Sequence, residues 1–72
     1  MRTCGNNPQL LNGRIMSTTF SNSLQGRPGD SITYACNPGF TMVQGQATIT
    51  CDEQLLWGAL PLCMSMLFVF FF

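Results

Sequence analysis

Apolar and polar residues alternate in two short segments of this chain. The segments are Ser31–Cys36 and residues 47–51. Their apolar faces carry Ile32, Tyr34 and Cys36 in the first and Ala47, Ile49 and Cys51 in the second. A period of two is typical of strands that are buried on one face. Residues 40–43 are expected to form a further short strand, whereas no segment has the period of an amphipathic helix.

Two turns are predicted beside these strands. Residues 27–30 read Arg-Pro-Gly-Asp, and residues 37–40 read Asn-Pro-Gly-Phe. Proline fixes φ and glycine accepts a positive φ, so the pair suits the two central positions of a turn. The strands are therefore expected to be short and closely connected.

The other segments also indicate short strands and loops. Residues 5–29 have no sustained period. Residues 44–46 predict a tight connection within a hairpin, and residues 52–54 a polar turn. Pro61 limits the last apolar piece to an edge strand or an extended segment, because proline cannot donate to a ladder of hydrogen bonds. The expected fold class is all-β.

Four cysteines suggest how so short a chain stays folded. A chain of 72 residues forms one small domain at most, and such domains usually need disulfides or a metal. The gaps between successive cysteines hold 31, 14 and 11 residues, without the close pairs of structural zinc sites, and histidine is absent. Disulfides are therefore favoured over zinc, with three pairings open. Disulfides indicate an oxidising compartment.

Charge is sparse and balanced, which disfavours several functions. Three arginines and three acidic residues give a net charge of +0. This is no basic patch for nucleic acid. Without histidine, Ser-His and Cys-His catalytic arrangements are impossible. The adjacent Asp52 and Glu53 are interpreted as a solvated corner, so neither an enzyme nor a cofactor is expected.

The two ends of the chain raise separate questions. Residues after Met1 and Arg2 are polar, unlike a signal peptide. We interpret the chain as a fragment of a longer secreted or membrane-anchored protein, with an incomplete gene product as the alternative. Residues 64–72 are almost wholly apolar, but a spanning helix needs about 20 residues. A truncated or non-native end is favoured over the start of a membrane anchor.

A set of positions spread over the chain resembles the sushi family, also called complement-control modules or short consensus repeats. The resemblance depends on all of these positions occurring together at the right spacing, and no single one of them would be specific. The positions are Cys4, the run Gly29-Asp30-Ser31-Ile32-Thr33-Tyr34-Ala35-Cys36, the turn Asn37-Pro38-Gly39-Phe40, Gly45, the run Thr48-Ile49-Thr50-Cys51, and the closing Trp57, Pro61 and Cys63. The expected division is a flank at 1–3, a module at 4–63 and an apolar tail at 64–72.

The resemblance implies a small, elongated β module stapled by two disulfides. The implied pairs are Cys4 with Cys51 and Cys36 with Cys63. It also implies a structural core of Tyr34, Gly39, Phe40, Trp57 and Pro61, with Trp57 packed among Tyr34, Phe40 and Ile49. Two spacings depart from the family pattern. Residues 40–45 are one residue longer, which predicts a bulge or wider turn, and residues 57–63 are one shorter.

The resemblance further implies an extracellular binding module, either secreted or part of an ectodomain. Expected partners are an extracellular protein or a glycan, beside neighbouring sushi or CUB modules in the parent chain. The variable surface of the family maps to residues 18–27 here, which makes Phe20, Asn22, Leu24 and Arg27 candidate contacts. Two alternatives stay open: a structural spacer without a partner, and a short membrane-associated form that uses the Phe-rich tail.

Overall fold

The chain folds into short strands, as the alternating pattern predicts. The computed structural model describes residues 2–21 and 25–69. These residues contain the strands β1 (Gly13–Thr18), β2 (Ser31–Cys36), β3 (Phe40–Gln44), β4 (Thr48–Thr50) and β5 (Leu62–Ser65) and one helical turn, α1 (Met66–Val69). The all-β prediction is confirmed. The single turn of α1 lies in the apolar tail, where no element was predicted.

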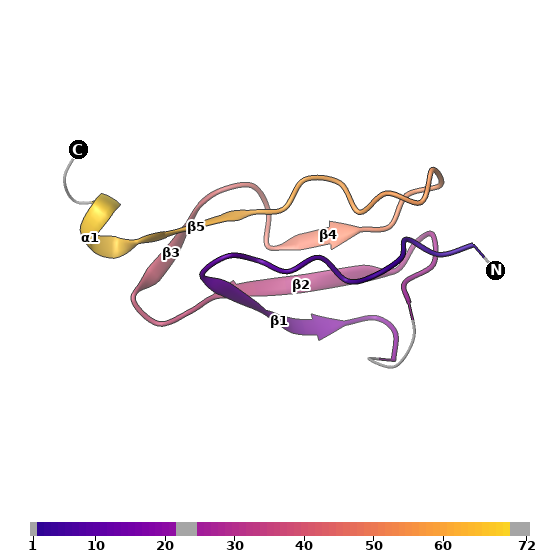
Figure 1. Cartoon of the computed structure of the whole chain (residues 1–72), viewed down its shortest axis with the longest axis horizontal. Helices are drawn as coiled ribbons and strands as arrows, with labels where there is room; N and C mark the ends of the chain where they lie inside the picture. The colour runs from indigo at the N-terminus through magenta and orange to yellow at the C-terminus, as the bar shows by residue number, and fades with distance from the viewer. Residues whose placement is uncertain (1, 22–24, 70–72) are drawn as a thin grey trace.

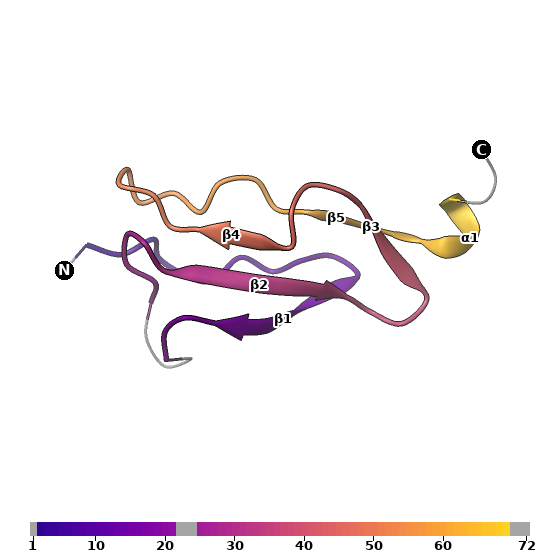
Figure 2. The same cartoon turned by 180° about the vertical axis from the view of Figure 1, so that it is seen from behind.

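Two small antiparallel sheets make up the module (Figures 1 and 2). The first has the order β1-β2-β4, and the second pairs β3 with β5. The molecule extends over 47 × 21 × 14 Å. The N-terminal segment and α1 lie at opposite ends of the long axis. The elongated shape agrees with the one that the resemblance implies.

The predicted strands agree with the observed ones to within one or two residues. β2 has the predicted bounds, and Ile32 and Tyr34 are buried. β3 runs one residue further than predicted, to Gln44, whereas β4 is shorter than residues 47–51. β1 lies in the segment that was expected to hold loops and short strands.

The connection at residues 44–46 does not close a hairpin. β3 pairs with β5, while β4 pairs with β2, so the connection carries the chain from one sheet to the other. The predicted hairpin is therefore wrong. The extra residue does form a bulge, because the register between β3 and β5 shifts between Met42 and Gln44.

Both predicted Pro-Gly turns are present. Gly29 and Gly39 adopt φ values of 95° and 88°. The amide of Asp30 donates to the carbonyl of Arg27 over 2.9 Å, and the amide of Phe40 donates to that of Asn37 over 3.0 Å. A positive φ at the third turn position requires glycine or a residue of similar freedom. Pro61 ends an extended segment, and β5 begins directly after it.

The hydrophobic core is thin and lies between the two long edges of the module. Its buried residues are Leu10, Ile32, Tyr34, Ile49, Cys51, Trp57 and Cys63. Phe40 is half-buried against this core, and Pro61 is buried. Gly39 is exposed, so it shapes the turn rather than filling the core.

Two disulfides join segments that are distant in the sequence. Cys4 is bonded to Cys51, with Cα atoms 6.0 Å apart, and Cys36 is bonded to Cys63, with Cα atoms 5.7 Å apart. These are the pairs that the resemblance implies. Since every cysteine is bonded to another, no thiolate remains to hold zinc.

We expect removal of either disulfide to unfold most of the molecule. The bonds span 47 and 27 residues, and closing such loops is worth about 4 kcal/mol each in the chain-entropy model. Small domains have only about 5–15 kcal/mol in total. Urea unfolding of Cys4→Ser/Cys51→Ser and Cys36→Ser/Cys63→Ser, followed by Trp57 fluorescence, measures the loss. Gln44→Ala, at an exposed position, is the control. An unchanged midpoint in either double variant would contradict the expectation.

Candidate interaction surface

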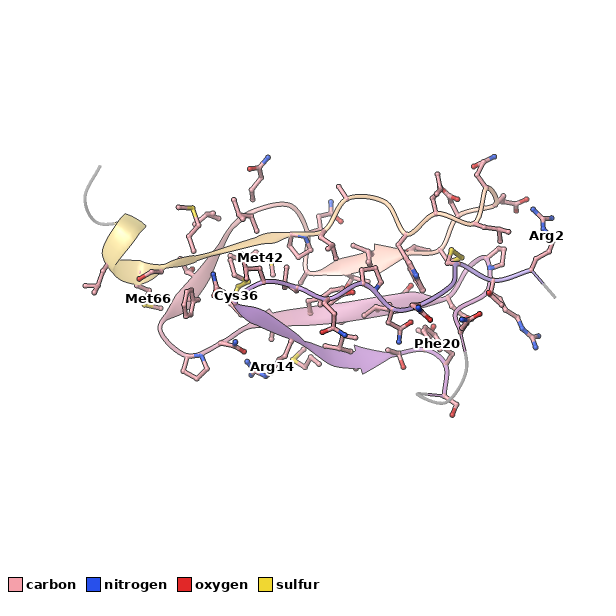
Figure 3. All side chains as sticks on the ribbon, viewed as in Figure 1. Arg2, Arg14, Phe20, Cys36, Met42 and Met66 are labelled. Carbon is pink, nitrogen blue, oxygen red and sulfur yellow. A yellow bond between two sulfur atoms is a disulfide. The ribbon has the colours of Figure 1, made fainter. Side chains whose placement is uncertain are left out.

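The loop after β1 is attached to the core by an aromatic stack. Phe20 is half-buried, and its ring lies 6.0 Å from that of Trp57 with an interplanar angle of 23°. Figure 3 shows Phe20 at the end of the module near Arg2, far from Met66. Offset aromatic pairs at this separation stabilise a fold beyond the area they bury. Much of Phe20 therefore serves packing.

Gly26 lets the other end of this loop approach the same tryptophan. A Cβ atom added to Gly26 would come within 2.6 Å of Trp57 Cζ2 and would also contact Cη2. The amide of Cys4 donates to the Gly26 carbonyl over 2.8 Å, which ties the first disulfide to this point. The expected packing of Trp57 in the core is present, but Phe20 and Gly26 were not expected beside it.

Of the other candidate contacts, the structure describes Arg27. Its side chain is exposed, and its backbone amide donates to the Asp30 carboxylate over 2.9 Å. The same carboxylate accepts from the hydroxyl of Thr19 over 3.1 Å. The Asp30 carboxylate therefore stabilises the turn at residues 27–30 and also joins it to Thr19. Asn22 and Leu24 lie outside the described residues.

The outer face of the three-stranded sheet is a row of hydroxyl groups that the sequence analysis did not single out. Thr33 and Thr48 are hydrogen-bonded over 3.0 Å, and Ser31 and Thr50 over 3.3 Å. Ser17 lies opposite Thr33. The sequence pattern could have indicated this row of hydroxyl groups, because these residues alternate with the buried ones in their strands. These hydroxyl groups offer neutral donors and acceptors, and Arg14, opposite Ala35, adds one cation to the same face.

The acidic corner is used for local structure. One oxygen of the Asp52 carboxylate accepts from the amides of Gln54 and Leu56, over 2.9 and 3.0 Å. The backbone carbonyl of Glu53 accepts from Arg2 over 2.9 Å. The described residues contain no group of three potential metal ligands and no pocket. Within them, no helix is long and apolar enough to cross a bilayer.

Tyr34 joins the central strand to the N-terminal segment. Its side chain is 2% exposed, and its hydroxyl donates to the Pro8 carbonyl over 2.6 Å. Burial raises the pKa of the Tyr34 hydroxyl, because a phenolate is poorly solvated there. The bond links residues far apart in sequence and holds the N-terminal segment against β2.

Comparison with known families matches residues 4–63 to the model described as sushi repeat (SCR repeat). The chain belongs to the sushi repeat family. The match runs from the first cysteine of the module to the last, and so includes both disulfides. Sushi repeats are extracellular modules that serve protein interaction, so this chain is an extracellular protein-interaction module in general terms.

A curated relative of this sushi module is complement receptor type 2 of Mus musculus. The two are 46% identical over 41 residues, which is 54% of this chain and 4% of the receptor. The chain therefore spans a very small part of the length of this relative. The likeness concerns one module and not the receptor as a whole.

Titration of Tyr34 should show the effect of its burial. Burial raises the pKa of Tyr34 in the folded protein above the value of about 10 in the unfolded chain. The neutral Tyr34 hydroxyl therefore contributes its full stabilisation at a pH below about 10, and this stabilisation is lost as the pH rises through the pKa of the folded protein. Ultraviolet absorbance of the phenolate reports Tyr34 alone, because the chain has one tyrosine. The midpoint should lie higher in the folded protein than in urea. Equal midpoints would contradict a buried hydroxyl.

Gly26→Ala should destabilise the module. The added methyl group meets the edge of a buried indole ring, and overpacking of this kind costs about 1–3 kcal/mol. Urea unfolding monitored by circular dichroism measures the change. Gln46→Ala, at an exposed position, should stay within about 0.5 kcal/mol. Equal stability of both variants would mean that the loop can move away from Trp57 without cost.

Proposed function

We propose that this chain is one sushi repeat of a longer complement-regulator, adhesion or receptor protein and that it binds an extracellular protein partner. The family match over residues 4–63 is the observation that carries the proposal. The similarity to a short part of a much longer receptor supports the placement in a longer protein. Neighbouring sushi or CUB modules would then flank it.

We place the partner contact at residues 18–27. Arg27 is exposed in this region, and long, exposed arginine side chains are frequent contacts in protein interfaces. Phe20 and Gly26, on either side of residues 22–24, pack against Trp57, and groups that are already ordered lose less entropy on binding. Asn22 and Leu24 belong to the same proposed surface by their position in the sequence.

The contact works by recognition and not by catalysis. Histidine is absent, all cysteines are bonded, and the Asp52 carboxylate accepts two backbone amides. The described residues form no pocket that would enclose a small substrate. One module 14–21 Å across offers a small contact area, and tandem modules raise the overall affinity by multivalency.

The second candidate function is a spacer that sets the distance between other domains. The length of 47 Å favours it, and so does the position of the N-terminal segment and α1 at opposite ends of the long axis. In that case the module contributes reach and stiffness without a partner of its own.

Arg27→Ala tests the contact directly, with Arg14→Ala as the matched control. Both side chains are exposed, but Arg14 lies on β1 and donates to the Cys36 carbonyl, away from the loop. A tetravalent form of the full chain is applied to an array of purified ectodomains. On the ectodomains that bind, we expect Arg27→Ala to weaken binding about fivefold or more, as at a contact worth about 1 kcal/mol.

The array also separates the two candidates. Specific binding that Arg14→Ala weakens and Arg27→Ala does not would refute the placement at residues 18–27. The binding role would be refuted if the chain binds no ectodomain. The spacer would be supported if, in addition, deleting the chain from a protein of several tandem modules shortens the distance between the modules on either side.

A further inference from the structure

One long edge of the module presents apolar side chains where a strand usually presents polar ones. Along the segment before and within β5, Pro61 and Cys63 point inward and are buried. Leu60 and Leu62, on the alternate positions, are 37% and 42% exposed. Met64 follows on the same side. An antiparallel strand with one solvated face normally carries polar residues there.

The apolar residues continue on both sides of this segment. Val43, 42% exposed, lies at the bulge of β3, directly before Gln44, whose partner in β5 is Leu62. Met66 and Leu67, 46% and 75% exposed, extend the row into α1. The amide of Met66 donates to the Gly39 carbonyl over 3.0 Å, so α1 is joined to the β2–β3 turn. We name Val43, Leu60, Leu62, Met64, Met66 and Leu67 the apolar edge.

We infer that the apolar edge lies against the surface of a lipid bilayer, a role independent of the protein contact proposed above. From Leu55 to Phe72 the sequence has no charged residue, and five of the last six residues of this stretch are phenylalanine or valine. The apolar edge is therefore continuous in sequence with a segment that water solvates poorly. Leucine, methionine and phenylalanine side chains at an interface gain free energy by entering the acyl boundary.

The apolar edge runs along the length of the module, so the module can lie lengthwise on the surface of a bilayer. The segment that contains β5 runs lengthwise along one side of the molecule, and β1 runs along the other (Figures 1 and 2). Figure 3 shows Arg14 on the side of β1, away from the segment that contains β5. The hydroxyl groups of Thr33 and Thr48 occupy a different face, which stays in water.

A stable protein partner fits the apolar edge less well than lipid does. Stable protein interfaces involve about 20–30 residues on each side, with polar groups around the rim. The apolar edge is a single narrow row of six side chains. It also lacks charges that would choose a partner or fix its register.

Vesicle flotation with the full chain tests the inference. The probes are vesicles of phosphatidylcholine alone and of phosphatidylcholine with phosphatidylserine. We expect the chain to float with both and to bind them within about twofold of each other, at low and high salt, because no basic residue takes part. The double variant Leu60→Gln/Leu62→Gln should bind about tenfold less, since two side chains lose their apolar contact.

Leu11→Gln is the matched control. Leu11 is 78% exposed and precedes β1, away from the apolar edge. It should bind vesicles like the unaltered chain. Mass analysis without reduction confirms that each variant keeps both disulfides, so that a loss of binding is not a loss of fold.

Three outcomes would overturn the inference. The unaltered chain does not float with either vesicle; or Leu60→Gln/Leu62→Gln floats as well as Leu11→Gln does; or the unaltered chain is a dimer without lipid that the double variant converts to a monomer. The last outcome would assign the apolar edge to a second copy of the chain. None of them bears on binding to ectodomains, so the two proposals fail separately.

Discussion

Two sulfur–sulfur bonds take the place of the core that a chain of 72 residues is too short to build. Among the residues that the structure describes, seven buried ones form the core, and two of them are cysteines of the disulfides themselves. Cross-links act mainly on the unfolded chain, whose entropy they reduce. The folded state can then remain thin, 14 Å in its shortest dimension, and leave most residues at the surface.

A thin module has several faces with different chemistry. The loop at residues 18–27 is held by the stack of Phe20 on Trp57, the outer face of the three-stranded sheet is covered by hydroxyl groups, and the apolar edge follows β5. Each face is built on alternate positions of strands or on loops, and the inward positions serve the core. Recognition at one face therefore need not disturb packing or another face.

Much of the fold follows from local sequence, but the pairing of strands does not. The alternation in Ser31–Cys36 and the Pro-Gly turns depend on near neighbours, and both are found as predicted. The partner of β3 is β5, which starts after Pro61 and is separated from β3 in the sequence by β4. Sequence order favoured a hairpin with the nearer strand. The disulfide between Cys36 and Cys63 instead fixes β5 to the end of β2, close to the start of β3.

The sequence by itself determined the positions of β2, β3 and β4, the Pro-Gly turns and the membership in a family, because these depend on residue type and spacing. It also excluded histidine-based catalysis. The tertiary structure decided which side chains share a surface. Phe20 reaches Trp57, and Gln44 comes to lie opposite Leu62, only after distant segments pack together. The sequence marks a leucine as apolar, but its exposure depends on which neighbours the folded chain places over it.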